Sequence, residues 1–286
     1  MNLKYIFIEM RPKQWTKNFF VYAAVLFNGS LFNVEKFFVT TEIFIAFCLL
    51  SSSVYFFNDI FDCESDRLNP DKCDRPIASG AISIKSAYFC AAILFLTSML
   101  LAYQVNFDCF LLLLSYAVIN ILYTVKLKKI VIVDVMIIAF GFVARALAGA
   151  WTAEIFLTEW FMLCVMFLSL FLALGKRRHE LENTNSTGKG RKVLQSYSLS
   201  LIDQMTNINS AALLMSYALF TMDANTQNKS AMILTIPLVL YGIFYYLYVV
   251  QIKGKGGAPD KILYKEKPIL LTVLIYVAVI VFSRNV

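Results

Sequence analysis

Nine long apolar runs separated by short polar segments constrain this chain more than any other feature. They cover about residues 18–33, 38–57, 84–104, 109–125, 130–150, 157–175, 205–222, 230–250 and 268–284. A transmembrane helix needs roughly 20 apolar residues, and these runs are apolar on all faces, unlike the alternating strands of a membrane barrel. With 59% hydrophobic residues, the chain has more apolar surface than a soluble fold can bury. The sequence predicts an all-α integral membrane protein in which residues 1–286 form one polytopic domain.

The basic residues are distributed unevenly among the segments that connect these runs. With nine spans, the N-terminus and every second loop share one side of the membrane, and that side carries 22 of the 26 Lys and Arg residues. Lys36, Lys229 and Arg284 lie on the other side, and Arg145 lies inside a span. Because loops rich in Lys and Arg stay in the cytoplasm, we expect a cytoplasmic N-terminus and a C-terminus outside the cell.

A dense group of carboxylates directly follows the second run. On a helix that turns by 100° per residue, Asn58, Asp62, Asp66 and Asp59 fall within one stripe. Unpaired carboxylates at this density repel one another, and hard oxygen ligands suit Mg²⁺, which substrate phosphates usually complete. We therefore predict the three aspartates as catalytic Mg²⁺ ligands, with Asn58 binding substrate. The alternative is a solvated acidic loop with internal salt bridges.

Two cations follow this stripe on the loop after Pro70, which breaks the helix. Lys72 and Arg75 can hold the outer oxygens of a Mg-bound diphosphate. The segment from Asn58 to Pro76 reads NDxxDxxxDxxxPxKxxRP. This string resembles the first signature of the UbiA superfamily of intramembrane prenyltransferases. The resemblance implies a nine-transmembrane-helix bundle with a cytoplasm-facing cavity.

The segment after the sixth run departs from the aromatic prenyltransferases of that superfamily, which carry a second carboxylate motif there. Here the chain reads LFLALGKRRHEL, with Lys176, Arg177 and Arg178 in place of the acids. Three cations at a helix end suit phosphate groups without a second metal. The alternative is an ordinary cytoplasmic anchor.

Further segments between Arg11 and Lys267 resemble one branch of the superfamily, the decaprenyl-phosphate phosphoribosyltransferases. They include RPKQWTKN at the start and the glycines of the last cytoplasmic loop. The resemblance implies a bacterial cell-membrane pentosyltransferase that moves 5-phosphoribosyl from phosphoribosyl diphosphate to a polyprenyl phosphate and releases diphosphate. Cell-wall biosynthesis is the implied setting, no nucleic acid takes part, and the oligomeric state is open.

This reaction fits the charged residues of the chain. The acidic motif can bind the Mg-bound diphosphate of phosphoribosyl diphosphate, and the basic segment can bind its phosphate at the other end. The lipid phosphate is already anionic and needs little help from a general base. Catalysis would come from positioning and charge neutralisation. Further candidates for substrate binding are Gln14, Lys17, Asn18, Tyr123, Lys128 and Asp134.

Helical spacing and position within a span single out two pairs of residues. Gln14 and Asn18 are one α-helical turn apart, so with Lys17 they could reach one phosphate; an interfacial anchor is the alternative. Asp134 and Arg145 are ionisable residues within a span, which are functional candidates by default. Asp134 lies near the cytoplasmic end, whereas the deeper Arg145 suits a structural pair.

Two rival functions remain open from the sequence. A UbiA-type prenyltransferase would move a prenyl group from its diphosphate to an aromatic acceptor, and the missing second acidic motif argues against it. A transporter with an acidic vestibule would move a substrate without turnover or Mg²⁺-dependent release of diphosphate.

Overall fold

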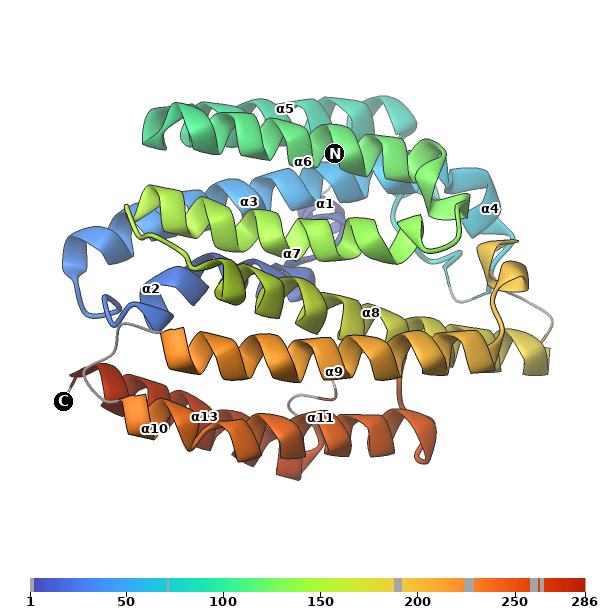
Figure 1. The fold of residues 1–286 in the computed structure, drawn as a ribbon. Coiled ribbons are helices and arrows are strands. Elements are labelled where there is room, and N and C mark those ends of the chain that lie inside the picture. The colour runs from blue at the N-terminus through green and yellow to red at the C-terminus, as the bar shows by residue number, and fades with distance from the viewer. Residues whose placement is uncertain are drawn as a thin grey trace. The chain divides into compact units, whose positions relative to one another are not determined.

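The computed structural model is helical, and the part of the chain that it describes contains no strand (Figure 1). The described residues are 3–70, 72–187, 192–223, 229–257, 262 and 265–285. The chain divides into two compact units. Unit 1 comprises Met1–Val25, Ser30–Lys128 and Ala144–Phe156, and unit 2 comprises Leu26–Gly29, Lys129–Val143 and Leu157–Val286. The predicted all-α class is confirmed.

Unit 1 is organised around the long helix α3, Val34–Phe61. Asn33 caps this helix, because its side chain accepts a hydrogen bond from the backbone N–H of Lys36 (3.0 Å). The other elements are α1 (Leu3–Glu9), the 3-10 helix η1 (Pro12–Tyr22), α4 (Cys63–Arg67), α5 (Ile84–Val105), α6 (Phe107–Val125) and the 3-10 helix η2 (Leu127–Lys129). Helix α3 packs against α1, η1, α4, α5 and α6, and the acidic motif begins at its C-terminal end.

Two helices, α2 (Ala23–Phe27) and α7 (Val133–Thr152), contribute residues to both units. Within unit 1, Gly149 of α7 lies directly against η1. A Cβ atom at this position would be 1.8 Å from the carbonyl oxygen of Val21. Only glycine permits so close an approach, which agrees with the helix-packing role expected for small residues in membrane proteins.

Unit 2 consists mainly of the helices α8 (Glu159–Thr187), α9 (Leu199–Asp223), α10 (Lys229–Ile233), α11 (Ile236–Gln251) and α13 (Lys267–Asn285), with the 3-10 helix η3 (Lys192–Ser196). Helix α8 packs against α9, α11 and η3. Leu174, Leu194 and Ile202 belong to a core that joins α8, η3 and α9. This core fixes the end of α8, where the basic segment lies.

Six helices among the described residues are long and apolar enough to cross a membrane. They are α3, α5, α6, α7, α8 and the segment Lys229–Gln251. These helices match six of the nine predicted runs and identify a multi-pass membrane protein.

Of the other three runs, the first differs from the predicted helix, whereas the seventh and the last each form one helix. The run at 18–33 is no single helix, because it is divided between η1 and α2 and then turns at Gly29, whose φ is +75°. Helix α9 is long enough but contains Asn207 and Asn209. The last run forms α13, Lys267–Asn285, whose described apolar part is Lys267–Val281.

Candidate active site

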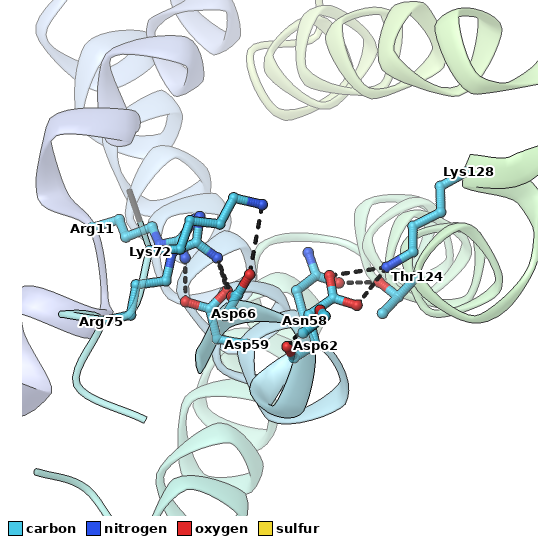
Figure 2. A network of polar contacts seen from close by, with 10 residues as sticks. Arg11, Asn58, Asp59, Asp62, Asp66, Lys72, Arg75, Thr124 and Lys128 are labelled. Atoms are coloured by element: carbon cyan, nitrogen blue, oxygen red, sulfur yellow. Dashed lines mark hydrogen bonds and ion pairs between the residues drawn. The ribbon is translucent and has the colours of Figure 1, made fainter. Parts of the chain in front are cut away.

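The acidic motif is not one continuous helix, as the stripe of carboxylates had led us to expect. Helix α3 ends at Phe61, and Asp62 has a non-helical backbone (φ −92°, ψ 4°) before α4 begins at Cys63. The four polar side chains nevertheless fall into two groups (Figure 2). Asp59 and Asp66 form one group, which we call the bridged pair, and Asn58 and Asp62 form the other.

The bridged pair is held together by a guanidinium group. Nη1 of Arg75 lies 3.1 Å from Oδ1 of Asp59 and 2.6 Å from Oδ2 of Asp66, so one nitrogen contacts both carboxylates. Arg11 forms an ion pair with Asp59, and Nζ of Lys72 lies 3.6 Å from Asp66. Both aspartates are almost completely buried, at 3% and 2% exposure. Three cations therefore surround two buried carboxylates.

The second group contacts the end of α6 and η2. Nζ of Lys128 lies 2.7 and 2.9 Å from the two carboxylate oxygens of Asp62, and the hydroxyl of Thr124 donates to Asn58 (Figure 2). Lys128 is thus brought to the acidic motif from 66 residues away. Tyr123, the neighbour of Thr124, is half-buried at the same end of α6.

These ion pairs correct the expectation of unpaired, mutually repelling carboxylates. Within the described residues, no three His, Cys, Asp or Glu side chains are grouped so that they could hold a metal ion. Asp59, Asp62 and Asp66 are neutralised by Arg and Lys instead. The basic residues that we assigned to phosphate binding, Lys72 and Arg75, are two of these partners.

Glu9 belongs to the same cluster and was missed by the sequence analysis. This last residue of α1 is 1% exposed, and its carboxyl group is hydrogen-bonded to that of Asp59. Burial, and then the hydrogen bond and negative charge of Asp59, raise the pKa of Glu9 to about 8. The only available signal in the sequence was an acid two residues before Arg11, which by itself indicates a solvated helix end.

A strained turn holds this acid in place. Arg11 has a φ of +53°, a conformation that non-glycine residues seldom adopt. The carbonyl of Met10 accepts a hydrogen bond from the Ser52 hydroxyl (2.9 Å), which in turn accepts one from the Trp15 indole N–H (3.1 Å). The turn therefore ties Glu9 and Arg11 to α3 at Asp59.

The predicted binding of one phosphate by Gln14, Lys17 and Asn18 stays a prediction, but the backbone differs from the α-helix on which it was based. These residues lie on a 3-10 helix with about three residues per turn, so positions 14 and 18 face different directions. Asn18 is fully buried and accepts a hydrogen bond from Nε of Arg145 (2.7 Å). Arg145 also donates to the hydroxyl of Tyr116 (2.9 Å), which fits the structural role expected for it. Gln14 and Lys17 remain half-buried candidates.

The basic segment of unit 2 is likewise paired rather than open. Nη2 of Arg177 lies 2.9 Å from Oδ2 of Asp134, and both side chains are buried. Arg178 forms ion pairs with Glu182 and Asp203. Arg177, Arg178 and Asp134 are therefore paired in this structure, and their role in substrate binding stays a prediction. Lys176 is half-buried and keeps its assignment as a candidate.

A tyrosine completes this second network. The Tyr197 hydroxyl donates to Oδ1 of Asp134 (2.8 Å) and accepts from the backbone N–H of Ile132 (2.7 Å). Ile132 has a φ of +71°, which is unusual for a β-branched residue. We call Asp134, Arg177 and Tyr197 the buried triad, and it holds the strained backbone that precedes α7.

The last glycine-rich loop lies against the basic segment within unit 2. A Cβ atom at Gly256 would be 2.7 Å from the carbonyl oxygen of Gly175, and one at Gly257 would be 2.7 Å from the ring of His179. Two segments that resemble one enzyme branch therefore contact each other, and glycine is required because the loop approaches α8 so closely.

Comparisons with known proteins agree with this architecture and with the first motif. Residues 18–264 match the model of the UbiA prenyltransferase family. In fold, the chain is similar to a UbiA homolog from Archaeoglobus fulgidus bound to GPP and Mg2+, with a TM-score of 0.75 and 18% identity, over 99% of this chain and 100% of that one.

Two relatives match nearly the whole sequence. The decaprenyl-phosphate phosphoribosyltransferase of Mycolicibacterium smegmatis is 32% identical over 95% of this chain and 89% of its own length. The enzyme of the same name from Corynebacterium glutamicum is 34% identical over 96% of this chain and 85% of its own. The resemblance inferred from the motifs is confirmed: this chain belongs to the UbiA prenyltransferase family.

Proposed function

We propose that this protein transfers 5-phosphoribosyl from phosphoribosyl diphosphate to a polyprenyl phosphate of the decaprenyl type and releases diphosphate. The observation that carries this proposal is the similarity to decaprenyl-phosphate phosphoribosyltransferases over 95% of the chain. The basic segment at Lys176–Arg178, where aromatic prenyltransferases carry acids, supports it. A bond forms between a lipid phosphate oxygen and C1 of the ribose, while the bond from C1 to the diphosphate breaks.

A divalent cation fits the chemistry of the acidic motif. Asp59 and Asp66 are buried, offer oxygen ligands and already share one cationic group, Arg75. We assign these two aspartates and Asp62 to Mg²⁺ binding, as the Mg2+-bound fold relative suggests. When bound, Mg²⁺ supplies charge neutralisation of the leaving diphosphate.

The ion pairs indicate how these residues change partners. Arg11, Lys72 and Arg75 now neutralise Asp59 and Asp66, so a divalent cation can replace them only if another anion accepts them. A diphosphate is such an anion, because guanidinium and ammonium groups bind phosphate oxygens well. We therefore expect Mg²⁺ and diphosphate to bind together, with Arg75 moving from carboxylate to phosphate.

We also propose the membrane arrangement that the sequence predicted. The chain would form a nine-span bundle in the bacterial cell membrane, as one polytopic domain, with its cavity and N-terminus facing the cytoplasm and its C-terminus outside. The 22 basic residues on one side support this orientation. Labelling of single cysteines introduced near Lys4 and Lys229 in intact cells tests it, because only the second should react with an impermeant reagent.

The activity is tested with purified protein in detergent, Mg²⁺, labelled phosphoribosyl diphosphate and decaprenyl phosphate. We expect labelled lipid and release of diphosphate. The rival prenyltransferase reaction is tested in parallel with a prenyl diphosphate and an aromatic acid. Consumption of the prenyl diphosphate without any labelled lipid would contradict the proposal.

A further inference from the structure

Glu9 is buried in a place where the surrounding helix is exposed. Its neighbours Phe7 and Ile8 in α1 are 58% and 47% exposed, whereas Glu9 is 1% exposed. In a membrane protein, outward-facing apolar residues can contact lipid, so the unusual feature of this helix is its buried acid. Burying a carboxyl group is costly unless it is well paired, which indicates that this acid has a role beyond packing.

The partner of Glu9 makes the arrangement more unusual. Its carboxyl group meets another acid, Asp59, although Arg11 is only two residues away and binds that same aspartate. Oε1 of Glu9 is buried and has no hydrogen-bond partner among the described residues. A buried acceptor atom without a partner, beside the buried carboxylate of Asp59, is available to a cation.

The backbone fixes this position from both sides. The hydrogen bond from Ser52 to the carbonyl of Met10 anchors the turn on α3, and the left-handed conformation of Arg11 reverses the chain there. Glu9 and Arg11 therefore reach Asp59 from one turn, one as an acid and the other as a base (Figure 2 shows Arg11 at Asp59).

We propose that Glu9 is a further ligand of the divalent cation, joining Asp59 and Asp66 when Arg75 is transferred to diphosphate. This inference rests on the proposed function only in requiring a divalent cation and a diphosphate at the acidic motif. It adds an N-terminal carboxylate to a motif that otherwise lies entirely between Asn58 and Pro76. Binding of the cation would then also hold α1 against α3.

The test compares Glu9→Gln with Glu64→Gln in the purified full-length protein in detergent. Glu64 is an exposed acid of α4, so its replacement makes the same carboxyl-to-amide change near the motif without touching Asp59. The melting temperature is recorded while MgCl₂ is titrated at a saturating concentration of inorganic diphosphate. We expect Glu9→Gln to raise the Mg²⁺ concentration at half-maximal stabilisation about tenfold or more, and Glu64→Gln to leave it unchanged.

An unchanged Mg²⁺ midpoint in Glu9→Gln would overturn the proposal. Glu9 would then be a neutral partner that positions Asp59, since glutamine retains a hydrogen-bond donor. If Glu9→Gln does not fold, Glu9→Asp serves instead: it keeps the charge but shortens the reach, and wild-type affinity there would also overturn the proposal. Because the readout is metal binding, a failure of phosphoribosyl transfer would leave this result interpretable on its own.

Discussion

The bridged pair in unit 1 and the buried triad in unit 2 are both ionic clusters, but their cations differ in exposure to solvent. The cations at the bridged pair are partly exposed, with Arg11 at 28% and Arg75 at 29%, and they come from separate segments. In the triad, Asp134 and Arg177 are 0% and 3% exposed and form an ion pair, and Arg177 also pairs with Glu180. Exposed cations can be transferred to an anionic substrate, whereas a fully buried pair serves to hold the structure together.

Replacing a carboxylate of the bridged pair should have the largest effect on activity. We expect Asp66→Ala to lower phosphoribosyl transfer about 1,000-fold, roughly 4 kcal/mol of transition-state stabilisation. Arg75 keeps its contact with Asp59 in this variant, so the fold should persist. The measurements are turnover and the melting temperature; retained turnover would remove Asp66 from the metal site.

Breaking the buried triad should instead lower the stability of the fold. Arg177→Ala leaves Asp134 buried without its cation, which we expect to lower the free energy of unfolding by about 3 kcal/mol. Thermal or denaturant unfolding in detergent measures this loss. A matched double variant, Asp134→Leu with Arg177→Met, should recover much of the stability. If Arg177→Ala is instead stable but inactive, Arg177 binds the substrate.

A milder change in the same triad sharpens the comparison. Tyr197→Phe removes the hydrogen bonds to Asp134 and to the N–H of Ile132, and we expect a loss of about 1–3 kcal/mol. Its melting temperature should fall, with the Mg²⁺ midpoint unaffected. A shifted midpoint would show that the triad is coupled to metal binding.

A further test is the pH dependence that arises from Glu9. Its pKa is about 8 in the folded protein against an ordinary value of 4.5. The folded state therefore keeps the proton that the unfolded chain loses, so stability present below pH 4.5 declines as the pH rises through 8. Melting temperatures between pH 5 and 8.5 in EDTA should show this decline, and Glu9→Gln should reduce it. An equal decline in both proteins would assign the effect to other groups.

The sequence predicted the elements better than the contacts between them. The apolar runs at α3, α5, α6, α7 and α8 were located correctly, because hydropathy over roughly 20 residues is a local property. The interruption at Asp62 was not predicted, since no proline or glycine marks it. The first predicted run was also wrong: its composition is apolar, but its backbone passes from the 3-10 helix η1 to the short α2 and then turns.

The site residues show the same division. The spacing of the aspartates identified the family, and the order of Asn58, Asp62, Asp66 and Asp59 around a helix already placed Asp59 next to Asp66. Helical spacing did not reveal that Asn18 is buried against Arg145, 127 residues away. It also gave no indication that Glu9 turns inward.

By itself, the sequence determined an all-α membrane protein of the UbiA family with an acidic motif, because hydropathy and motif spacing are written along the chain. Only the tertiary structure decided which charges neutralise one another. Arg11 meets Asp59 across 48 residues, and Lys128 meets Asp62 across 66. The energy of an ion pair depends on distance and burial in space, and neither quantity can be read from separation along the sequence.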